Sequence, residues 1–389
     1  MKILLSPILI GTFTIFACLW PRRAIREAGA EVVMVSPHGP FGARLEDEGF
    51  RWIPAPMDRR SLNPLRELRL LGRLTAIYRR EQPDLAHHFT LKCVVYGAVA
   101  ARIAGVNASV GAVTGLGHVF CSDTPRARLL RPFVRMLVRH AMDMPRSRLI
   151  VQNPDDRALF LEHALIRPER LRVIRGSGVN TVKFTPRAST SPSRPFRVLM
   201  ATRMLWEKGV GEYMETARLL RPRYPRVEFL LAGGPDQGNP ASVPESHLAD
   251  WNRTNLVRCL GHVAKIDELL AEVDLVVLPS YREGAPRILL ETAAAGLPIV
   301  TTDVPGCREV VRHGVNGLLV PPRDAPALAD AIASLIEHPE RGRKMGLAGR
   351  NIALAEFDES IVIRRTLDVY RELMPSFRTA QADCAGSFA

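Results

Sequence analysis

The chain has 389 residues, of which 47% are hydrophobic and 24% are charged, and its formal net charge is +13. This is more than twice the usual length of a single domain, so we expect two domains of about 190 residues each. The composition excludes collagen-like, coiled-coil and disordered classes. Single cysteines at positions 18, 93, 121, 259, 307 and 384, without any C-x-x-C pair, indicate neither a disulfide framework nor a zinc site and are typical of a reducing cytoplasm.

The positive charge belongs to the first half of the chain. Residues 1–190 hold 29 lysines and arginines against 15 aspartates and glutamates, whereas the remainder has 24 against 25. Arginines gather in residues 59–80 and 126–140, where they alternate with leucines and valines at helical spacing. Helices that lie on an anionic membrane have this pattern, and so do plainly solvated helix faces. No RNA-binding motif, zinc-finger spacing or aromatic-basic interleaving accompanies the charge, so we expect no nucleic-acid partner.

The predicted elements begin with an uncharged stretch, residues 3–20, which is 18 residues long. That length is the lower limit for a membrane span. The stretch contains Pro7, Gly11 and two threonines, only Lys2 precedes it, and it lacks a small-residue cleavage site. We therefore predict a buried strand followed by the start of a helix, with a membrane anchor as the alternative.

Strand-like apolar runs then alternate with helical patterns through the first half. In chain order, strands are expected in residues 2–9, 31–36, 84–89 and 108–113, and helices in residues 22–30 and 94–105. Such alternation is typical of a parallel sheet with crossover helices. We predict that residues 1–190 form a doubly wound, Rossmann-like α/β domain.

A second βα series follows residues 183–195, where proline and serine accumulate as they do in linkers. Strands are expected in residues 196–204, 227–234, 255–263 and 274–280, and helices in residues 209–224 and 266–273. We predict a second doubly wound domain over residues 191–357, and a final amphipathic helix within 358–375 that packs back on the first domain. Two such domains would face a central cleft at the carboxyl ends of their strands, where ligands bind in these folds.

One strand-to-helix turn concentrates candidate binding residues. After the buried strand that ends near residue 280, Glu283, Gly284 and Ala285 precede a helix predicted to begin at Pro286, and Glu291 lies two turns deeper. Backbone amides at such a turn, with the positive end of the helix dipole, form a site suited to phosphate. Glu291 could accept hydrogen bonds from a diol. A capping acid and a solvated glutamate are the structural alternative.

Two cations follow the first strand of the same domain. Arg203 and Lys208 stand five positions apart in "RMLWEKG", at the expected mouth of the same sheet. An arginine and a lysine beside a helix N-terminus can neutralise a diphosphate without a metal, although two surface cations would look the same in isolation. We find no D-x-D metal pair, and interpret the acidic pair in "NPDD" (153–156) as part of a helix cap, so we predict no metal site.

Several segments together resemble one enzyme family. "ATRMLWEKG" resembles the G-R-L-x-x-x-K-G element, and "EGAPRILLE" the E-x7-E element, of retaining glycosyltransferases of family four, which have the GT-B fold. The resemblance extends to residues 87–92, 111–120, 151–160, 173–184, 260–263 and 301–324. It is strongest to the branch that builds capsule, exopolysaccharide and O-antigen units on an undecaprenyl-diphosphate carrier.

The resemblance implies roles for the donor-side residues. Arg203 and Lys208 would hold the diphosphate of a nucleotide-sugar, Gly284 and Ala285 would offer backbone amides, Glu283 would contact the transferred sugar and Glu291 the ribose hydroxyls. The donor expected from the family is a UDP-sugar, with no further cofactor. A lipid-linked acceptor would explain the basic first domain.

On the acceptor side the chain departs from the family. The loop after the first strand is apolar, "GTFTIFACLWPRR", where many members are glycine-rich or carry His-Arg, and Thr114 stands where many have the histidine of a T-x-H-G segment. His118 and His87 are possible substitutes, though a lone histidine near a strand end is more often a structural hydrogen-bonding residue.

We therefore expect a retaining, metal-independent glycosyltransferase that moves a hexose or N-acetylhexosamine from a UDP-sugar to a lipid-linked saccharide. It would work in the cytoplasm, peripherally on the inner face of the cytoplasmic membrane. A UDP-sugar epimerase or phosphorylase on the same fold is the alternative enzyme, and a catalytically silent, membrane-associated subunit is the alternative that is not an enzyme. The sequence does not identify the donor sugar, the acceptor, the linkage or the oligomeric state.

Overall fold

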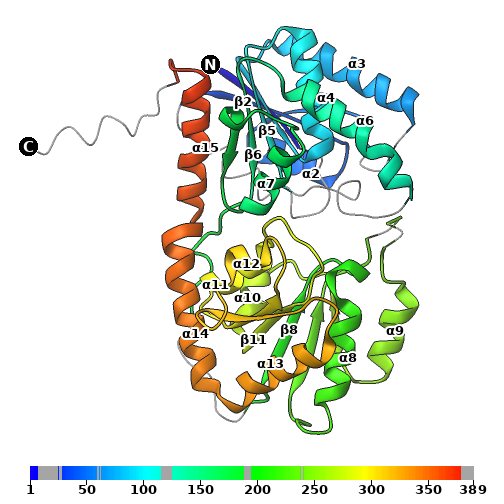
Figure 1. Cartoon of the computed structure of the whole chain (residues 1–389), viewed down its shortest axis with the longest axis vertical. Helices are drawn as coiled ribbons and strands as arrows, with labels where there is room; N and C mark the ends of the chain where they lie inside the picture. Colours follow the sequence, from blue (N-terminus) through cyan, green and yellow to red (C-terminus); the bar gives the residue numbers. More distant parts are fainter. Residues whose placement is uncertain are drawn as a thin grey trace, which may run out of the picture. The chain divides into compact units, whose positions relative to one another are not determined.

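The computed structural model describes residues 1–7, 25, 29–58, 61, 63–114, 125–187, 194–236, 238–239 and 241–377. It divides into two compact units (Figure 1): unit 1 is Met1–Arg175 with Val362–Ala389, and unit 2 is Gly176–Ile361. Each unit is built on one parallel sheet, as the alternation of apolar runs and helical patterns predicts.

Unit 1 has a seven-stranded sheet in the order β3-β2-β1-β4-β5-β6-β7, with every neighbouring pair parallel. Its strands are β1 (Lys2–Pro7), β2 (Glu31–Ser36), β3 (Arg51–Pro54), β4 (Leu85–Phe89), β5 (Ala108–Val113), β6 (Ser147–Val151) and β7 (Leu171–Val173). The strands read as continuous apolar runs because helices cover both faces. The order reverses between β1 and β4, which is the topological switch point of this sheet.

The helices of unit 1 lie on the two faces of this sheet. They are α2 (Pro40–Asp47), α3 (Pro64–Glu81), α4 (Leu91–Ala104), α6 (Pro125–Met142), α7 (Pro154–Glu162), the 3-10 turn η1 (Pro168–Arg170) and α15 (Glu359–Leu373). Ile3 and Leu5 share a core cluster with Tyr370 of α15, while Leu4 packs with side chains of α3 and α4. Alternate residues of β1 therefore face opposite helical layers, the doubly wound arrangement.

Unit 2 has a six-stranded parallel sheet in the order β10-β9-β8-β11-β12-β13. Its strands are β8 (Arg197–Ala201), β9 (Glu228–Ala232), β10 (Arg258–Gly261), β11 (Leu275–Leu278), β12 (Ile299–Thr302) and β13 (Gly317–Val320). Its helical segments are η2 (Trp206–Lys208), α8 (Val210–Leu220), α9 (Glu245–Arg253), α10 (Ile266–Ala271), α11 (Arg287–Ala294), α12 (Cys307–Val310), α13 (Ala325–Glu337), α14 (Pro339–Ile352) and the π-helical η3 (Ala353–Phe357). The switch point lies between β8 and β11.

The division between the units falls before the proline- and serine-rich segment. Val179 and Phe184 belong to the core of unit 2, and Nη2 of Arg187 lies 2.6 Å from Oδ1 of Asp274 in the same unit. The chain from Gly176 to Arg187 is thus part of unit 2, whereas we expected the first domain to run to residue 190. From Val362 onward α15 belongs to unit 1, where His87 Nδ1 lies 2.6 Å from the hydroxyl of Tyr370.

Two further sequence predictions can be compared with the structure, those for residues 3–20 and for the "NPDD" segment. Of the uncharged stretch 3–20, residues up to Pro7 belong to strand β1 and the rest lie outside the described residues. In the described part of the chain, none of the helices combines the length and the hydropathy needed to cross a membrane. In "NPDD", it is Asn153 that caps α7, because its Oδ1 accepts from the backbone N–H of Asp156 at 2.7 Å.

Candidate functional site

Lys208 and Glu283 meet at the switch point of unit 2. Lys208 ends the turn that follows β8, and Glu283 lies in the turn that follows β11, the adjacent strand. Lys208 Nζ donates to Oε1 of Glu283 at 2.7 Å, and both side chains are largely buried. The pair therefore lies at the carboxyl edge of the sheet, where open α/β folds bind their ligands.

A glycine allows the two turns to approach this closely. Gly209 follows Lys208 with φ +76°, and a Cβ atom there would lie 2.1 Å from the backbone oxygen of Pro279, at the end of β11. Only glycine fits such a contact in this backbone conformation. In the K-G part of the motif, Lys208 therefore presents its ammonium, and Gly209 allows the turn after β8 to contact the turn after β11.

The Glu283 turn rests on a third segment, which follows β12. The backbone N–H of Glu283 donates to the oxygen of Pro305 at 3.3 Å. Gly306 has φ +81°, and a Cβ atom there would lie 2.5 Å from the backbone oxygens of Glu283 and Gly284. We did not predict this support from the sequence, although the Pro-Gly pair after a buried strand was a visible signal.

Tyr281, in the same turn, is held by two further side chains that sequence reasoning missed. Its hydroxyl donates to Oε1 of Glu212 at 2.7 Å, and the guanidinium of Arg323 lies 4.6 Å from its ring centre. Burial, with the nearby Glu212 carboxylate, raises the pKa of Tyr281 to about 12. The hydroxyl thus stays protonated at neutral pH and can keep this turn attached to α8.

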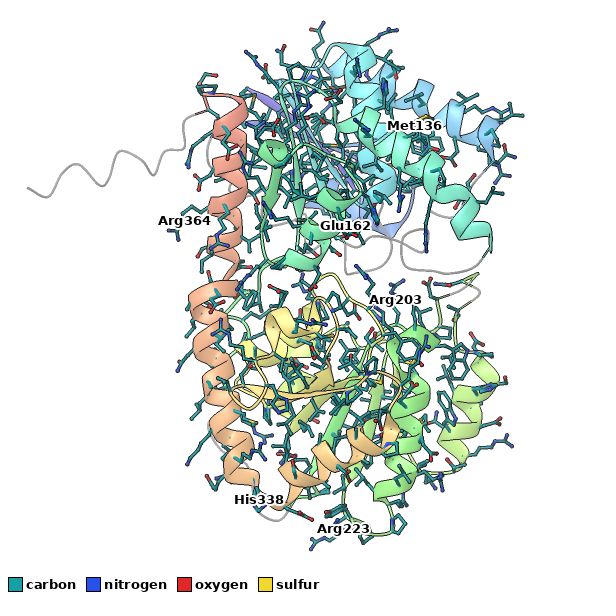
Figure 2. All side chains as sticks on the ribbon, viewed as in Figure 1. Met136, Glu162, Arg203, Arg223, His338 and Arg364 are labelled. Atoms are coloured by element: carbon teal, nitrogen blue, oxygen red, sulfur yellow. The ribbon has the colours of Figure 1, made fainter. Side chains whose placement is uncertain are left out.

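Arg203 has a carboxylate partner of its own. Its Nη1 lies 2.8 Å from Oδ2 of Asp236, in the loop after β9, and its side chain is 43% exposed. The backbone N–H of Asp236 donates to Ser242 Oγ at 3.0 Å, and Asn239 Nδ2 donates to Oδ2 of Asp236 at 3.1 Å. Asp236 is therefore fixed by its own loop and in turn directs the guanidinium of Arg203, which Figure 2 labels.

Glu291 is buried on α11, one turn beyond an arginine that we did not single out. Arg287 Nε donates to its Oε1 at 2.6 Å, and the two side chains are 12% and 8% exposed. Burial raises the pKa of Glu291, while the Arg287 guanidinium and then Lys183 oppose that rise. The helix itself begins at Arg287, with Pro286 as its N-cap, so Gly284 and Ala285 lie immediately before the cap.

Of the acceptor-side candidates, His87 is buried inside unit 1. It is 1% exposed in the middle of β4, contacts Tyr370 of α15 and stacks on Phe89 at 4.1 Å between ring centres. Burial, and then the neighbouring His88, lowers the pKa of His87 to about 3. A neutral side chain enclosed in this way anchors α15, and we do not carry it into the proposed site.

The other two acceptor-side candidates are Thr114 and His118. Thr114 is exposed directly after β5, at the carboxyl edge of the sheet of unit 1. His118 lies outside the described residues.

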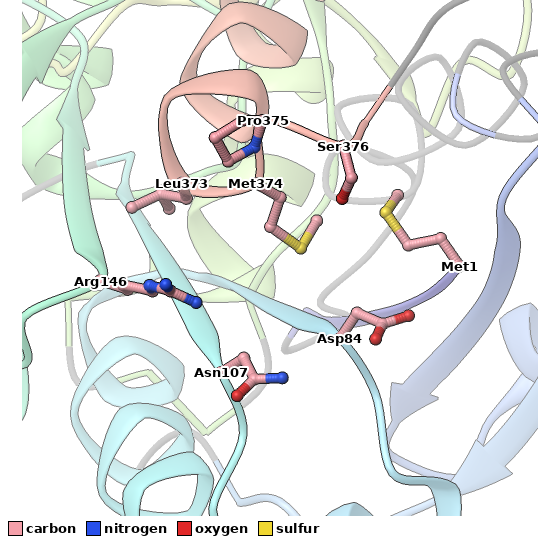
Figure 3. A pocket seen from close by; sticks show the side chains of 8 residues that line it. All are labelled: Met1, Asp84, Asn107, Arg146, Leu373, Met374, Pro375 and Ser376. Atoms are coloured by element: carbon pink, nitrogen blue, oxygen red, sulfur yellow. The ribbon is translucent and has the colours of Figure 1, made fainter.

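Two surface pockets lie at sheet edges, one at the amino ends of strands in unit 1 and the other at the carboxyl ends of strands in unit 2. One, of about 400 Å³, is lined by Met1, Asp84, Asn107 and Arg146, which precede strands of unit 1, and by the end of α15 (Figure 3). It lies at the amino ends of the strands, away from the edge that binds ligands in such folds. The other, of about 440 Å³, lies in unit 2 beside Met204, Gly233, Gly234 and His262, at the carboxyl ends of β8, β9 and β10.

Two family models match most of the chain. Residues 2–153 match the model described as glycosyl transferase 4-like, and residues 195–338 match that of glycosyl transferases group 1. Each match falls within one unit of the structure.

Relatives of known name match over three quarters of the chain or more. The N,N'-diacetylbacillosaminyl-diphospho-undecaprenol alpha-1,3-N-acetylgalactosaminyltransferase of Campylobacter jejuni is 28% identical over 359 residues, which cover 90% of this chain and 93% of that protein. The UDP-Gal:alpha-D-GlcNAc-diphosphoundecaprenol alpha-1,3-galactosyltransferase of Escherichia coli is 23% identical and covers 75% and 76%. Among solved structures, Anabaena Alr3699/HepE in complex with UDP covers 96% of this chain and all of that one, at 22% identity and a TM-score of 0.77, which shows that the two share a fold.

Proposed function

We propose that this chain transfers a hexose or N-acetylhexosamine from a UDP-sugar to a saccharide on undecaprenyl diphosphate. The chain belongs to the glycosyltransferases whose first domain matches the glycosyl transferase 4-like model and whose second domain matches the glycosyl transferases group 1 model. The observation that carries the proposal is the Lys208–Glu283 pair at the switch point of unit 2, with Arg203 in the turn that Lys208 ends. The undecaprenyl carrier is taken from the names of the two relatives described above.

The donor site uses both cations for the diphosphate. Lys208 is already directed by Glu283, and Arg203 by Asp236, so each cation is held at the sheet edge before a ligand arrives. The backbone amides of Gly284 and Ala285, just before the N-cap of α11, add donors on the opposite side of the phosphates. Glu283 contacts the sugar hydroxyls, and Glu291, which Arg287 Nε holds through Oε1, accepts from the ribose diol.

The reaction breaks the bond between the anomeric carbon and the diphosphate oxygen. Negative charge grows on that oxygen, and Lys208 and Arg203 stabilise it in a turn from which water is partly excluded. The acceptor hydroxyl forms the new bond on the same face of the sugar, and its proton passes to the departing diphosphate. The anomeric configuration is thereby retained, and no metal is needed where two cations already balance the charge.

The acceptor belongs to the basic unit 1. An undecaprenyl-diphosphate saccharide is anchored in a membrane, so the enzyme works peripherally on the inner face of the cytoplasmic membrane. Thr114, at the carboxyl edge of the sheet of unit 1, is the described residue that we propose to contact the acceptor. The loop after β1 and His118, which lie outside the described residues, remain candidates from the sequence.

The proposal is tested in two steps. Nucleotide-sugars are first screened for thermal stabilisation, because a donor at a hundred times its Kd should stabilise the protein by about 2.7 kcal/mol. The best donor is then incubated with undecaprenyl-diphosphate-linked saccharides, and the products are analysed. A glycosylated lipid with retained configuration supports the proposal, whereas an epimerised donor, a sugar phosphate or no product from any stabilising donor overturns it.

A further inference from the structure

Three helices of unit 1 form one basic surface, which we call the three-helix face. α4 packs against both α3 and α6, so the three lie side by side (Figure 1). Their sequences hold twelve lysines and arginines but only two acidic residues, Glu67 and Glu81, both in α3. The helices thus concentrate much of the positive charge of the first half of the chain.

The two acidic residues are buried, and among the twelve cations they pair with Lys92 and Arg80. Glu67 is buried, and its Oε1 accepts from Lys92 Nζ at 2.7 Å. The side chain of Glu81 is 2% exposed and lies 3.0 Å from Arg51, 3.0 Å from Arg80 and 3.7 Å from Lys2. The exposed charged residues of α3 are therefore all arginines: Arg66, Arg69, Arg73, Arg79 and Arg80.

Large apolar side chains are exposed on the same helices. Apart from Met1, every exposed large hydrophobic residue in the described part of unit 1 lies on them: Leu65 (65% exposed), Leu68 (64%), Ile103 (49%), Leu129 (81%) and Met136 (58%). Figure 2 labels Met136 in this part of unit 1. Arginines interspersed with several exposed large apolar side chains on neighbouring helices are typical of helices that lie in a membrane interface.

We propose that the three-helix face docks unit 1 on an anionic lipid bilayer, with its arginines on lipid phosphates and Leu65, Leu68, Leu129 and Met136 inserted at the headgroup level. This deepens the proposed function, and the choice of a bilayer over a nucleic acid rests on the lipid-linked acceptor named there. α4 begins directly after β4, so the face reaches the carboxyl edge of the sheet, the edge that also carries Thr114. A carrier lipid in the same bilayer would present its diphosphate and saccharide beside that edge.

The test uses the full chain and sedimentation with vesicles of phosphatidylcholine alone or with phosphatidylglycerol. We expect binding only to the anionic vesicles, with release at high salt, because surface charges are screened within ~3 Å near molar ionic strength. Arg66→Ala, Arg69→Ala and Arg73→Ala combined should weaken binding about 100-fold, at about fivefold per arginine. Leu129→Asp with Met136→Asp should weaken it about tenfold or more.

Matched controls come from α14 in unit 2, which also carries exposed cations and an exposed leucine. Combined Ala substitutions of Arg341, Arg343 and Lys344, and Leu347→Asp (59% exposed), should leave vesicle binding unchanged. If the control variants lose binding as much as the three-helix variants, the attraction is general and the proposal fails. Equal binding to neutral vesicles, or tighter binding of an RNA oligomer than of anionic vesicles at the same salt, also overturns it.

The outcome can be separated from that of the proposed function. UDP binding, followed by calorimetry without lipid, reports on unit 2 and should be the same in all of these variants. A protein that binds UDP but no anionic vesicle overturns the docking face alone. A protein whose three-helix variants lose vesicle binding as predicted, but which transfers no sugar to any lipid-linked acceptor, supports the face and overturns the proposed function.

Discussion

Lys208 and Glu283 are joined by a hydrogen bond of 2.7 Å between residues 75 positions apart in the chain. The bond links the turns after β8 and β11, the two strands on either side of the switch point of unit 2. Both side chains are largely buried, so each holds the other in place. In the proposed site, the lysine that faces the diphosphate is therefore positioned by the glutamate that faces the sugar.

We predict that Lys208→Ala lowers kcat by ~10²–10³, because it removes a donor to the charge that develops on the departing diphosphate. Glu283→Gln should also lower kcat rather than raise the donor KM, since we propose that Glu283 contacts the reacting sugar. The double variant should cost less than the product of the two single effects, because the residues act as a pair. Steady-state kinetics on the donor and acceptor found by the screen measures all three.

Folding must be controlled in these variants, because breaking a buried ion pair costs about 3–5 kcal/mol when one partner stays charged. Each variant should be assayed well below its melting temperature and compared with Arg218→Ala, which breaks an exposed ion pair to Glu215 on α8. If folded Lys208→Ala and Glu283→Gln both keep the kcat of the unaltered protein, the site assignment fails and the turn is structural.

The alternation of apolar runs and helical patterns was sufficient to predict two doubly wound domains. Strands such as β4 and β5 are buried at every position, so their sequences carry the signal locally. The candidate donor-side residues could also be predicted from local patterns, because short turns after buried strands place them at one edge of the sheet. Strand order thus places Lys208 and Glu283 in the turns of two adjacent strands.

What could not be predicted depends on pairings between distant segments. Asp236 fixes Arg203 only because the loops after β8 and β9 are neighbours and the Asp236 loop folds on Asn239 and Ser242. His87 looked available at the end of a strand, but its side chain faces Tyr370, which is 283 positions later. No local pattern in the sequence says which helix covers which face of a sheet.

The Arg287–Glu291 pair leads to a prediction about nucleotide binding. Glu291→Gln should raise the donor KM more than it lowers kcat, because the proposed ribose contact would be equal in ground and transition states. Arg287→Met should act through Glu291, because the guanidinium of Arg287 opposes the effect of burial on the pKa of Glu291. Without it, burial and the nearby Asp267 raise that pKa further, and Lys183 is the main group that still opposes the rise. A protonated carboxyl accepts poorly from a diol, so UDP affinity should fall as the pH falls.

Calorimetric titration of UDP between pH 5.5 and 8 measures this effect. Arg287→Met should weaken UDP most at the acid end, Arg287→Lys should restore much of the affinity, and Glu291→Gln should lack this dependence. A purely structural role for Arg287 would weaken UDP equally at every pH, and that result would contradict the prediction.

We predict that chelation leaves turnover unchanged. Arg203 and Lys208 supply two positive charges where metal-dependent transferases use a divalent cation. The measurement is kcat after exhaustive EDTA treatment, with and without added Mg²⁺ or Mn²⁺. Loss of turnover that either ion restores would show that a metal carries part of the diphosphate charge.

The buried histidines of β4 predict an acid-labile unit 1. Burial lowers the pKa values of His87 and His88 to about 3, from 6.5 in an exposed histidine. In the unfolded chain both histidines bind protons below pH 6.5, whereas in the folded chain they stay neutral until about pH 3. The free energy of unfolding therefore falls as the pH falls from 6.5 towards 3, by up to about 1.4 kcal/mol per pH unit for each histidine. Hydrogen exchange of β4 measures this slope. It should flatten in His87→Gln with His88→Gln, and an unchanged slope would assign the acid lability to other groups.

Gly209 gives the last prediction, because the close approach of the β8 and β11 turns depends on it. An alanine there would place Cβ 2.1 Å from the oxygen of Pro279 at φ +76°, so the turn must move and Lys208 with it. The left-handed backbone alone costs about 1–2 kcal/mol. Gly211→Ala is the matched control, since its Cβ would meet only the Trp206 ring, at 3.8 Å, and its position in α8 favours alanine by up to about 1 kcal/mol.

Melting temperature, UDP affinity and kcat are measured for both glycine variants. Gly209→Ala should lose stability and weaken UDP binding, and kcat should fall as in Lys208→Ala, because the ammonium no longer reaches Glu283. Gly211→Ala, two residues away in the same segment, should keep all three values or gain slightly in melting temperature. If Gly209→Ala is less stable but retains full kcat, the contact with Pro279 serves the fold alone, and the position of Lys208 does not depend on it.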